Sequence, residues 1–294
     1  MKKAFFDLLP PASVAVVVLF WAMVPTWFVE KPWSLVLVSS VMAVFVQFLE
    51  LIHERHVGWR INKRELFTDI FYVIFGATVI QWLTTELADD PLGALKQSLG
   101  IATQWAMHLP FFLQVMLVVL LIEFGQYWMH RLMHNQSFFW STHAPHHHIT
   151  QLNAMKGYVG NPLELFLISL SVVALFDLPL AAVFGGLNVI GIVAIFAHAN
   201  VRSDPPRWYS FFFTTIRHHS LHHTALSYED TRCNYGCAII LFDRILGTYR
   251  EGESEIVGQG ERVRLSIREQ FLFPLRPLVA MINAKRKTVA PEAG

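Results

Sequence analysis

Long apolar stretches alternate with short polar connections over the first two thirds of the chain. Four of them are long enough to cross about 30 Å of hydrocarbon as helices, since each residue adds about 1.5 Å. They are residues 10–29, 33–52, 66–83 and 109–128. Two shorter stretches follow, at 163–176 and 183–198. These two predict a short helical hairpin that crosses thinly or is re-entrant, and both versions return the chain to the side that it left.

The composition agrees with a membrane protein. The 294 residues are 54% hydrophobic and 15% charged, against about 25% charged residues in ordinary soluble proteins. The 24 Phe, 9 Trp and 7 Tyr suit lipid contact and the aromatic belts of membrane interfaces. Lys2 and Lys3 precede the first apolar stretch as in a signal peptide. No small-residue cleavage site stands out, however, so we expect a retained span.

Basic residues are distributed unevenly among the connections. If the N-terminus is cytosolic, the outer connections carry only Lys31 and Lys96 of the 23 Lys and Arg. The positive-inside rule therefore predicts a cytosolic N-terminus and C-terminus. We expect an interfacial helix near 92–105 in the outer connection 84–108, and a cytosolic helical cap from residue 199 onward. No basic patch of the kind that binds nucleic acid is present.

Nine histidines form three clusters and one single residue in the second half of the chain. The clusters read His130-Arg-Leu-Met-His134, His143-Ala-Pro-His146-His147 and His219-Ser-Leu-His222-His223, and the single residue is His198. Spacings of three and four residues put side chains on one face of a helix, about 5–6 Å apart at Cβ. Neutral imidazole is the commonest side-chain metal ligand and suits iron and zinc. The three clusters together predict a polynuclear metal site on the cytosolic side.

The remaining histidines are expected to have other roles. His53, His56 and His108 have no partner at ligand spacing, and hydrogen bonds at the membrane surface account for them. His148 and His218 adjoin the clusters, and we assign them supporting roles rather than ligation. Nine clustered imidazoles without a metal would need many hydrogen bonds, and each unsatisfied buried group costs about 1–3 kcal/mol.

These motifs resemble a known family. HxxxH, HxxHH and a second HxxHH around apolar segments are similar to the fatty acid hydroxylase/sterol desaturase superfamily of integral-membrane oxygenases. Around His198, the run Phe196-Ala-His198-Ala-Asn200 resembles that superfamily's His-x-Asn element, and Asn234-Tyr-Gly236 and Phe242–Tyr249 resemble the segment after its last cluster. The resemblance covers about residues 110–250.

Two positions depart from the family pattern. Asn161-Pro-Leu-Glu164 stands where many members have His-Pro-Leu-Glu. Leu221 stands where an aromatic residue is frequent, which affects the expected substrate pocket. Neither departure removes a clustered histidine.

The resemblance implies an all-α integral membrane bundle of four long spans plus a short hairpin, with a cytosolic helical cap that holds two iron ions. All nine histidines would be ligands. The iron ions would use O₂ to hydroxylate or desaturate an unactivated C–H bond of a lipid. The chain has no ferredoxin-type cysteine pattern and no glycine-rich dinucleotide motif, so the electrons would come from a separate ferredoxin, cytochrome or reductase.

Several polar residues near the clusters are candidates for fixing the imidazole tautomers. They are Glu123, Glu164, Asn200, His218, Glu229, Asp230 and Asn234. Helix–helix pairing and ordinary ion pairs explain the carboxylates equally well. Glu123 lies about two turns before His130 within a span, where ionisable groups are usually functional or paired, and we hypothesise that it supports metal occupancy. Asp243 is expected to order the cap.

Two further classes of function remain open. A zinc-dependent hydrolase of membrane lipids would need only three or four protein ligands per zinc ion. A metal transporter or sensor would use histidine-rich loops, whereas these clusters have helical spacing. Cys233 and Cys237 are expected to be reduced packing thiols.

We expect three regions along the chain. Residues 1–108 provide the N-terminal spans and the outer loop, and 109–250 form the catalytic region. Residues 251–294 form a cytosolic segment whose last part, 285–294, is expected to fray.

Overall fold

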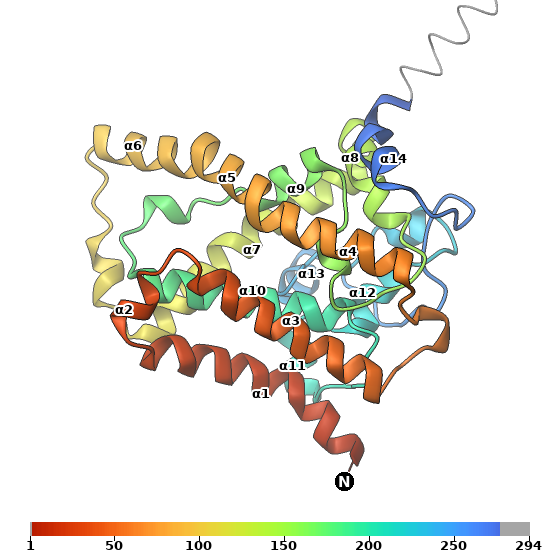
Figure 1. Cartoon of the computed structure of the whole chain (residues 1–294). Coiled ribbons are helices and arrows are strands. Elements are labelled where there is room, and N and C mark those ends of the chain that lie inside the picture. Colours follow the sequence, from red (N-terminus) through yellow and green to blue (C-terminus); the bar gives the residue numbers. More distant parts are fainter. Residues whose placement is uncertain (1, 277–294) are drawn as a thin grey trace, which may run out of the picture.

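The computed structural model describes residues 2–276, which form helices joined by turns (Figure 1). Within these residues there is no β-sheet, and the isolated bridges are Glu54–Val201 and Thr224–Val257. The predicted all-α class is therefore confirmed. The predicted frayed tail at 285–294 lies outside the described residues.

The helices follow one another without a repeat. The first seven are α1 (Lys2–Met23), α2 (Thr26–Val29), α3 (Ser34–Ile52), α4 (Lys63–Phe75), α5 (Gln81–Thr84), α6 (Asp90–Ser98) and α7 (Phe111–Asn135). The next seven are α8 (Ser137–His147), α9 (Pro162–Ser169), α10 (Leu180–His198), α11 (Arg207–Phe212), α12 (Ile216–His222), α13 (Leu241–Leu246) and α14 (Ile267–Leu272).

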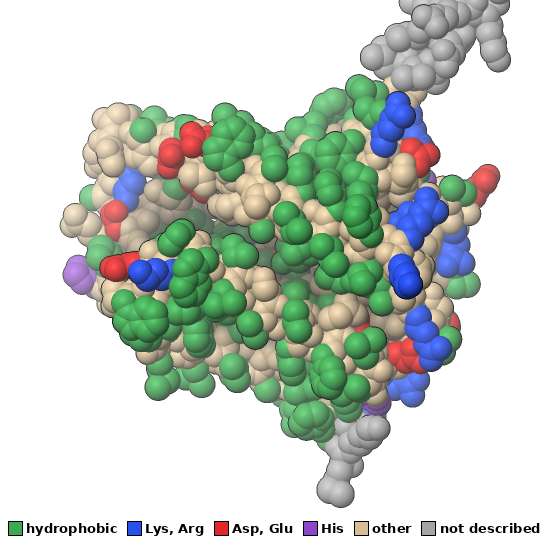
Figure 2. Space-filling view, viewed as in Figure 1, with side chains coloured by type: hydrophobic (Ala, Val, Ile, Leu, Met, Phe, Trp, Pro, Cys, Tyr) green, Lys and Arg blue, Asp and Glu red, His purple; other side chains and the backbone are tan. Residues whose placement is uncertain are grey.

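Five helical segments in the described part of the chain are long and apolar enough to cross a membrane. They are 3–23, 34–52, 63–98, 111–135 and 180–198. Figure 2 shows hydrophobic side chains over the face formed by α1, α3 and α4, with Lys and Arg gathered at one end of the molecule. The predicted hairpin is only half correct, because its second arm is the full-length helix α10 of 19 residues. Its first arm, α9, has 8 residues.

The third span is longer than expected. It runs for 36 residues through α4, α5 and α6, which Figure 1 shows as one rod. Two π-helical segments, Gly76–Ile80 and Thr85–Asp89, interrupt its α-helical turns. The prediction of a separate interfacial helix at 92–105 is wrong, since residues 90–98 continue the span. Segments of π-helix inside α-helices often mark functional sites.

Helix α1 begins at Lys2, so the predicted start of this span at residue 10 is wrong. Two prolines, Pro10 and Pro11, lie inside the helix. Pro10 has no N–H to donate to the carbonyl of Phe6. Ser203 Oγ fills that place and donates to the Phe6 carbonyl over 2.9 Å. The proline therefore ties the start of α1 to the segment that follows α10.

Helix α10 is the centre of the bundle, packed against α1, α3 and α7. Of its most apolar stretch, 61% is buried within the protein, against 22% for α1 and for α3. Gly186 permits the close approach of α7, because a Cβ there would overlap Val118. Asn188 accepts a hydrogen bond from Trp21 Nε1 and donates one to Ser39 Oγ, both over 2.8 Å. These bonds join three helices at one level.

Buried carboxylates of the N-terminal spans hold the segments beside the histidine clusters. Glu50 of α3 accepts from the backbone N–H groups of Ala154 (2.8 Å) and Asn200 (2.6 Å). In α4, Asp69 accepts from Lys156 Nζ over 2.6 Å. Lys156 is 1% exposed and also donates to Glu65. The first half of the chain therefore positions loops that belong to the second half.

The buried lysine generates a prediction about stability. Replacing Lys156 with Met would leave Asp69 buried without its cation and would leave Glu65 with Arg264 alone, which costs about 3–5 kcal/mol. We expect the free energy of unfolding in detergent to fall by that amount. The matched control is Lys63→Met at an exposed position of α4, the helix that carries Glu65 and Asp69. Equal stability of the two variants would contradict the assigned role of Lys156.

A second ion pair predicts a pH dependence. Arg55 Nη2 donates to Glu253 Oε2 over 2.7 Å, and this hydrogen bond lowers the pKa of Glu253 from 4.5 to about 2. A depressed pKa stabilises the folded state above pH 4.5, and that contribution is lost as the pH falls from 4.5 towards 2. Thermal unfolding of the wild type should therefore lose more stability across this window than that of Glu253→Gln. Parallel curves for the two proteins would refute the pairing.

Candidate metal centre

Four helices bring the nine clustered histidines together. His130 and His134 lie in the last two turns of α7, and His198 ends α10. The second cluster ends α8, and the third ends α12. Each of the nine side chains is at most 6% exposed. These residues are therefore withdrawn from water, as a reactive metal site requires.

The nine residues form two groups whose ligand atoms lie within 4.8 Å of one another. The first group is His130, His134, His143, His147 and His222, and the second is His146, His198, His219 and His223. Each pair at spacing i, i+4 stays within one group, because such residues share a helix face. The middle histidine of each HxxHH cluster points to the other group. Each HxxHH cluster thereby links both groups.

Backbone carbonyls orient four of the rings through their Nδ1 atoms. The pairs are His130 with Tyr235 (2.7 Å), His146 with Val159 (2.7 Å), His222 with Cys233 (2.7 Å) and His198 with Ala194 (2.9 Å). A carbonyl oxygen can only accept, so the proton of each neutral ring is on Nδ1. The lone pair is then on Nε2, the atom that faces the group.

This tautomer leaves lone pairs facing each other. Nε2 of His130 and Nε2 of His222 are 3.0 Å apart, and neither carries a proton to donate. His143 Nε2 lies at the same 3.0 Å from Nε2 of His130 and of His147. Two nitrogen ligands about 2.1 Å from one metal ion and at right angles to each other are about 3.0 Å apart. The residues present therefore fit a cation at the centre of the group.

Burial keeps the rings in the form that binds metal. It lowers the pKa of the His143 imidazole to about 3 and also lowers the pKa of His146. Both rings are therefore neutral at physiological pH, with a lone pair available.

Glu164 is the carboxylate that reaches a clustered ring. Its Oε1 lies 2.6 Å from His143 Nδ1, and its Oε2 accepts from the backbone N–H of Asn161 over 3.1 Å. Asn161 in turn begins α9 as its N-cap and donates to the carbonyls of Gln270 (2.8 Å) and Phe271 (3.0 Å). The asparagine that departs from the family pattern therefore caps α9 and also binds the backbone of α14.

The other candidate carboxylates do not contact an imidazole. Glu123 accepts from the backbone N–H groups of Ala238 and Ile239, each over 2.9 Å. Glu229 and Asp230 have 71% and 45% of their side chains exposed, and they form surface ion pairs with arginines. The structure therefore gives Glu123 a role in anchoring the loop, and the other two a role on the surface.

The remaining polar candidates act on backbone segments. Asn200 accepts from the N–H of His56 over 2.8 Å. Asn234 has a positive φ of 52° and donates to the carbonyl of His218 over 3.0 Å. The ring of His218 approaches Thr215 Oγ1 at 3.3 Å and lies outside both groups. Both cysteines are free.

Asp243 positions a clustered histidine indirectly. It accepts from the N–H groups of Tyr235 and Gly236, each over 2.8 Å. This fixes the Tyr235 peptide, whose carbonyl holds His130. The carbonyls of Val159, Cys233 and Tyr235 are contacts that sequence reasoning missed, because every residue has a carbonyl and no side chain marks these.

A cavity of about 190 Å³ adjoins both histidine groups. His130 and His143 line it from the first group, and His146, His198 and His219 line it from the second. The rest of its wall is mainly apolar and comes from α9 and α10, with Leu165, Ile168, Ile190 and Ile195. Its mainly apolar wall next to the histidine groups suits an alkyl chain.

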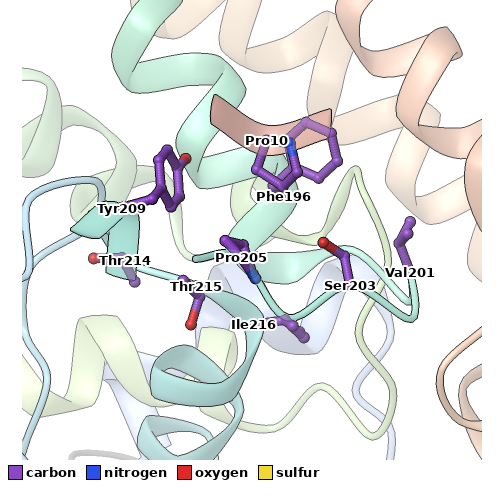
Figure 3. A pocket seen from close by; sticks show the side chains of 9 residues that line it. All are labelled: Pro10, Phe196, Val201, Ser203, Pro205, Tyr209, Thr214, Thr215 and Ile216. Atoms are coloured by element: carbon purple, nitrogen blue, oxygen red, sulfur yellow. The ribbon is translucent and has the colours of Figure 1, made fainter. Parts of the chain in front are cut away.

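A separate cavity near Tyr209, shown in Figure 3, is too small for a substrate. Its volume is about 10 Å³, and its lining includes Tyr209, Thr215 and Pro205. That is room for one water molecule at most. None of the clustered histidines lines it.

Residues 115–248 match the fatty acid hydroxylase family. The chain is 27% identical over 226 residues to ornithine lipid hydroxylase OlsE of Rhizobium tropici, covering 74% of this chain and 67% of that protein. It is 27% identical over 157 residues to the Delta(7)-sterol 5(6)-desaturase erg3B of Aspergillus fumigatus, covering 52% and 44% of the two chains. It is 30% identical over 142 residues to human alkylglycerol monooxygenase, covering 47% and 31%.

The matched part therefore spans about two thirds of the first relative and less than half of the other two. No solved structure matches the chain.

The two groups predict how metal content changes with substitution. His134→Ala should remove the metal of the first group and His219→Ala that of the second, so each variant should lose about half of the bound metal. The double variant should lose nearly all of it. Elemental analysis of purified protein measures the content, with exposed His108→Ala as the control. A single substitution that empties both groups would show that they are not independent.

Proposed function

The chain belongs to the fatty acid hydroxylase/sterol desaturase superfamily, and we propose that it is a membrane-bound di-iron oxygenase of lipids. The observation that carries the proposal is the pair of buried groups of five and four histidines beside an apolar cavity. When bound, two iron ions supply the activation of O₂ and the oxidation of an unactivated C–H bond to an alcohol or a double bond.

The protein's own residues prepare the site in three ways. Backbone carbonyls hold protons on Nδ1 and aim the Nε2 lone pairs inward. Glu164 orients His143 and increases its basicity. The buried position of both groups excludes water, which prevents side reactions at the site.

The substrate is proposed to be a lipid. The relatives' names describe hydroxylases and desaturases of ornithine lipid, sterol, alkylglycerol and sphingolipid. The apolar wall beside the histidines suits an aliphatic segment of such a molecule. The C–H bond to be oxidised would enter this cavity from the bilayer.

Electrons are proposed to come from a separate ferredoxin, cytochrome or reductase on the cytosolic side. The basic residues favour an orientation with the N-terminus and the histidine groups facing the cytosol. The end of the molecule where Lys and Arg gather would then face both the carrier and the anionic lipid headgroups (Figure 2).

The other two classes of function fit the site less well. The catalytic zinc of a hydrolase is held by three protein ligands and keeps its fourth position open for water, whereas these groups offer five and four histidines. A transporter or sensor would have to release its metal, and here every ligand is enclosed by four helices.

The proposal predicts a product that depends on one histidine. Lipids of cells that express the wild type with O₂ should contain species heavier by one oxygen atom or lighter by two hydrogen atoms. His146→Ala should abolish these species, because it removes one of four nitrogen ligands of the second group, and exposed His108→Ala should retain them. Mass spectrometry of total lipid extracts gives the comparison. Oxidised species that form equally without O₂ would rule out an oxygenase.

A further inference from the structure

The cavity beside the histidines has a larger neighbour further along α10. The second cavity has a volume of about 400 Å³, and Gln126 of α7 lines both cavities. Along α10 the lining passes from His198 and Ile190 in the first cavity to Leu187 and Val183 in the second. The two together follow about 22 Å of this helix, at about 1.5 Å per residue. Figure 2 shows the surface hollowed between α5–α6 and the α2–α3 side.

The lining becomes polar with distance from the histidines. The second cavity is bordered by the side chains of Gln81, Thr84, Asp89, Ser169 and Ser171. Thr84 and Ser169 share a hydrogen bond of 2.5 Å between their hydroxyl oxygens. Thr84 directly precedes the π-helical segment Thr85–Asp89, and Asp89 ends it. The irregular part of the rod therefore supplies polar groups to the cavity.

Asp89 carries a negative charge that the described residues leave unpaired. No hydrogen bond or ion pair joins its carboxylate to another residue in the range 2–276. The lysine two turns further along the rod, Lys96, is engaged with Asp177 at 2.5 Å. Ionisable groups in membrane-spanning segments are usually paired or functional. Asp89 therefore offers a counter-ion to a cation that enters the cavity.

Gln126, which lines both cavities, has a hydrogen-bond acceptor without a partner in the described part of the chain. Its Nε2 donates to the carbonyl of Ile168 over 3.1 Å. Its Oε1 is buried and has no partner in the described part of the chain. A buried acceptor without a donor is costly, and a hydroxyl or amide N–H of a bound molecule would satisfy it. Gln126 lies one turn before His130, so such a group would sit close to the metal site.

We infer that the second cavity binds the amine of a cationic lipid substrate, with Asp89 as its counter-ion. Gln126 Oε1 accepts a hydrogen bond from a hydroxyl or amide N–H of the same lipid. The alkyl chain of the lipid continues along α10 to the histidines. This assignment rests on the proposed function and specifies its substrate class. Because the two ends are separated along α10, the oxidised carbon lies in the chain, remote from the amine.

The lining selects among possible headgroups. A phosphate or carboxylate would meet Asp89 with like charge, which is unfavourable in a site of low dielectric constant. A quaternary ammonium is normally held by several aromatic rings, and among the described residues lining this cavity Phe176 is the only aromatic one. Asp89 together with the hydroxyls of Thr84 and Ser171 instead suits the N–H donors of a primary amine.

The experiment compares Asp89→Asn with Asp90→Asn, a neighbouring carboxylate that is exposed and does not line the cavity. Purified wild type and variants, each with measured metal content, are incubated in detergent with hexadecylamine, hexadecanol or palmitate. Native mass spectrometry then measures the bound probe. The wild type and Asp90→Asn should retain hexadecylamine over hexadecanol by about tenfold or more, and Asp89→Asn should lose this preference at unchanged metal content. An equal preference in Asp89→Asn, or none in the wild type, would overturn the assignment.

A charge reversal and a cellular assay separate this site from the proposed function. Asp89→Lys should shift retention from hexadecylamine to palmitate. In cells, Asp89→Asn should form at least about tenfold less oxidised amine lipid than Asp90→Asn. A wild type that selects hexadecylamine but forms no oxidised lipid would refute the oxygenase and keep the binding site. Oxidised lipid formed equally by both variants would refute the binding site and keep the oxygenase.

Discussion

The centre of this protein depends on one electrostatic constraint, the mutual repulsion of imidazole lone pairs. Carbonyls fix the proton of His130 and of His222 on Nδ1, so their Nε2 atoms face each other at 3.0 Å with no proton between them. A cation relieves that repulsion and turns it into attraction. The surrounding structure must therefore hold the carbonyls of Tyr235 and Cys233 in place. Asp243 holds the peptide of Tyr235, and Glu123 holds the chain just beyond it.

The helix period made the candidate ligands predictable. Spacings of three and four residues mark a helix face whatever the fold, so the nine histidines could be identified from the sequence. Their division between two groups also follows the i, i+4 rule, although which group each joins depends on how four helices meet. Glu164 reaches a ring while Glu229 points to solvent, and no local pattern distinguishes these two carboxylates. The orienting carbonyls have no sequence signature at all.

Element boundaries were less predictable, for identifiable physical reasons. The span 63–98 continues past its apolar part because π-helical turns keep the chain helical through polar residues. Helix α10 begins at Leu180 rather than at 183, with Pro179 as its N-cap, and it ends at His198 as predicted. The start of α1 lies before two prolines because a distant serine replaces the missing donor. Only for α1 is a contact from outside the segment, the hydrogen bond from Ser203 to Phe6, part of the reason.

The hydrogen bonds from α3 and α4 to the loops beside the histidines determine whether part of this fold could exist on its own. The family match begins at residue 115, yet Glu50 and Asp69 hold Ala154, Asn200 and Lys156 from outside that match. In a fragment limited to the matched residues, the N–H groups of Ala154 and Asn200 would lose the acceptor Glu50, and the Lys156 ammonium group would lose Asp69. The segment that matches the family is therefore not an autonomous module that could be transplanted onto other spans. It is one part of a single cooperative unit, and any exchange of N-terminal halves between relatives would have to carry these two carboxylates with it.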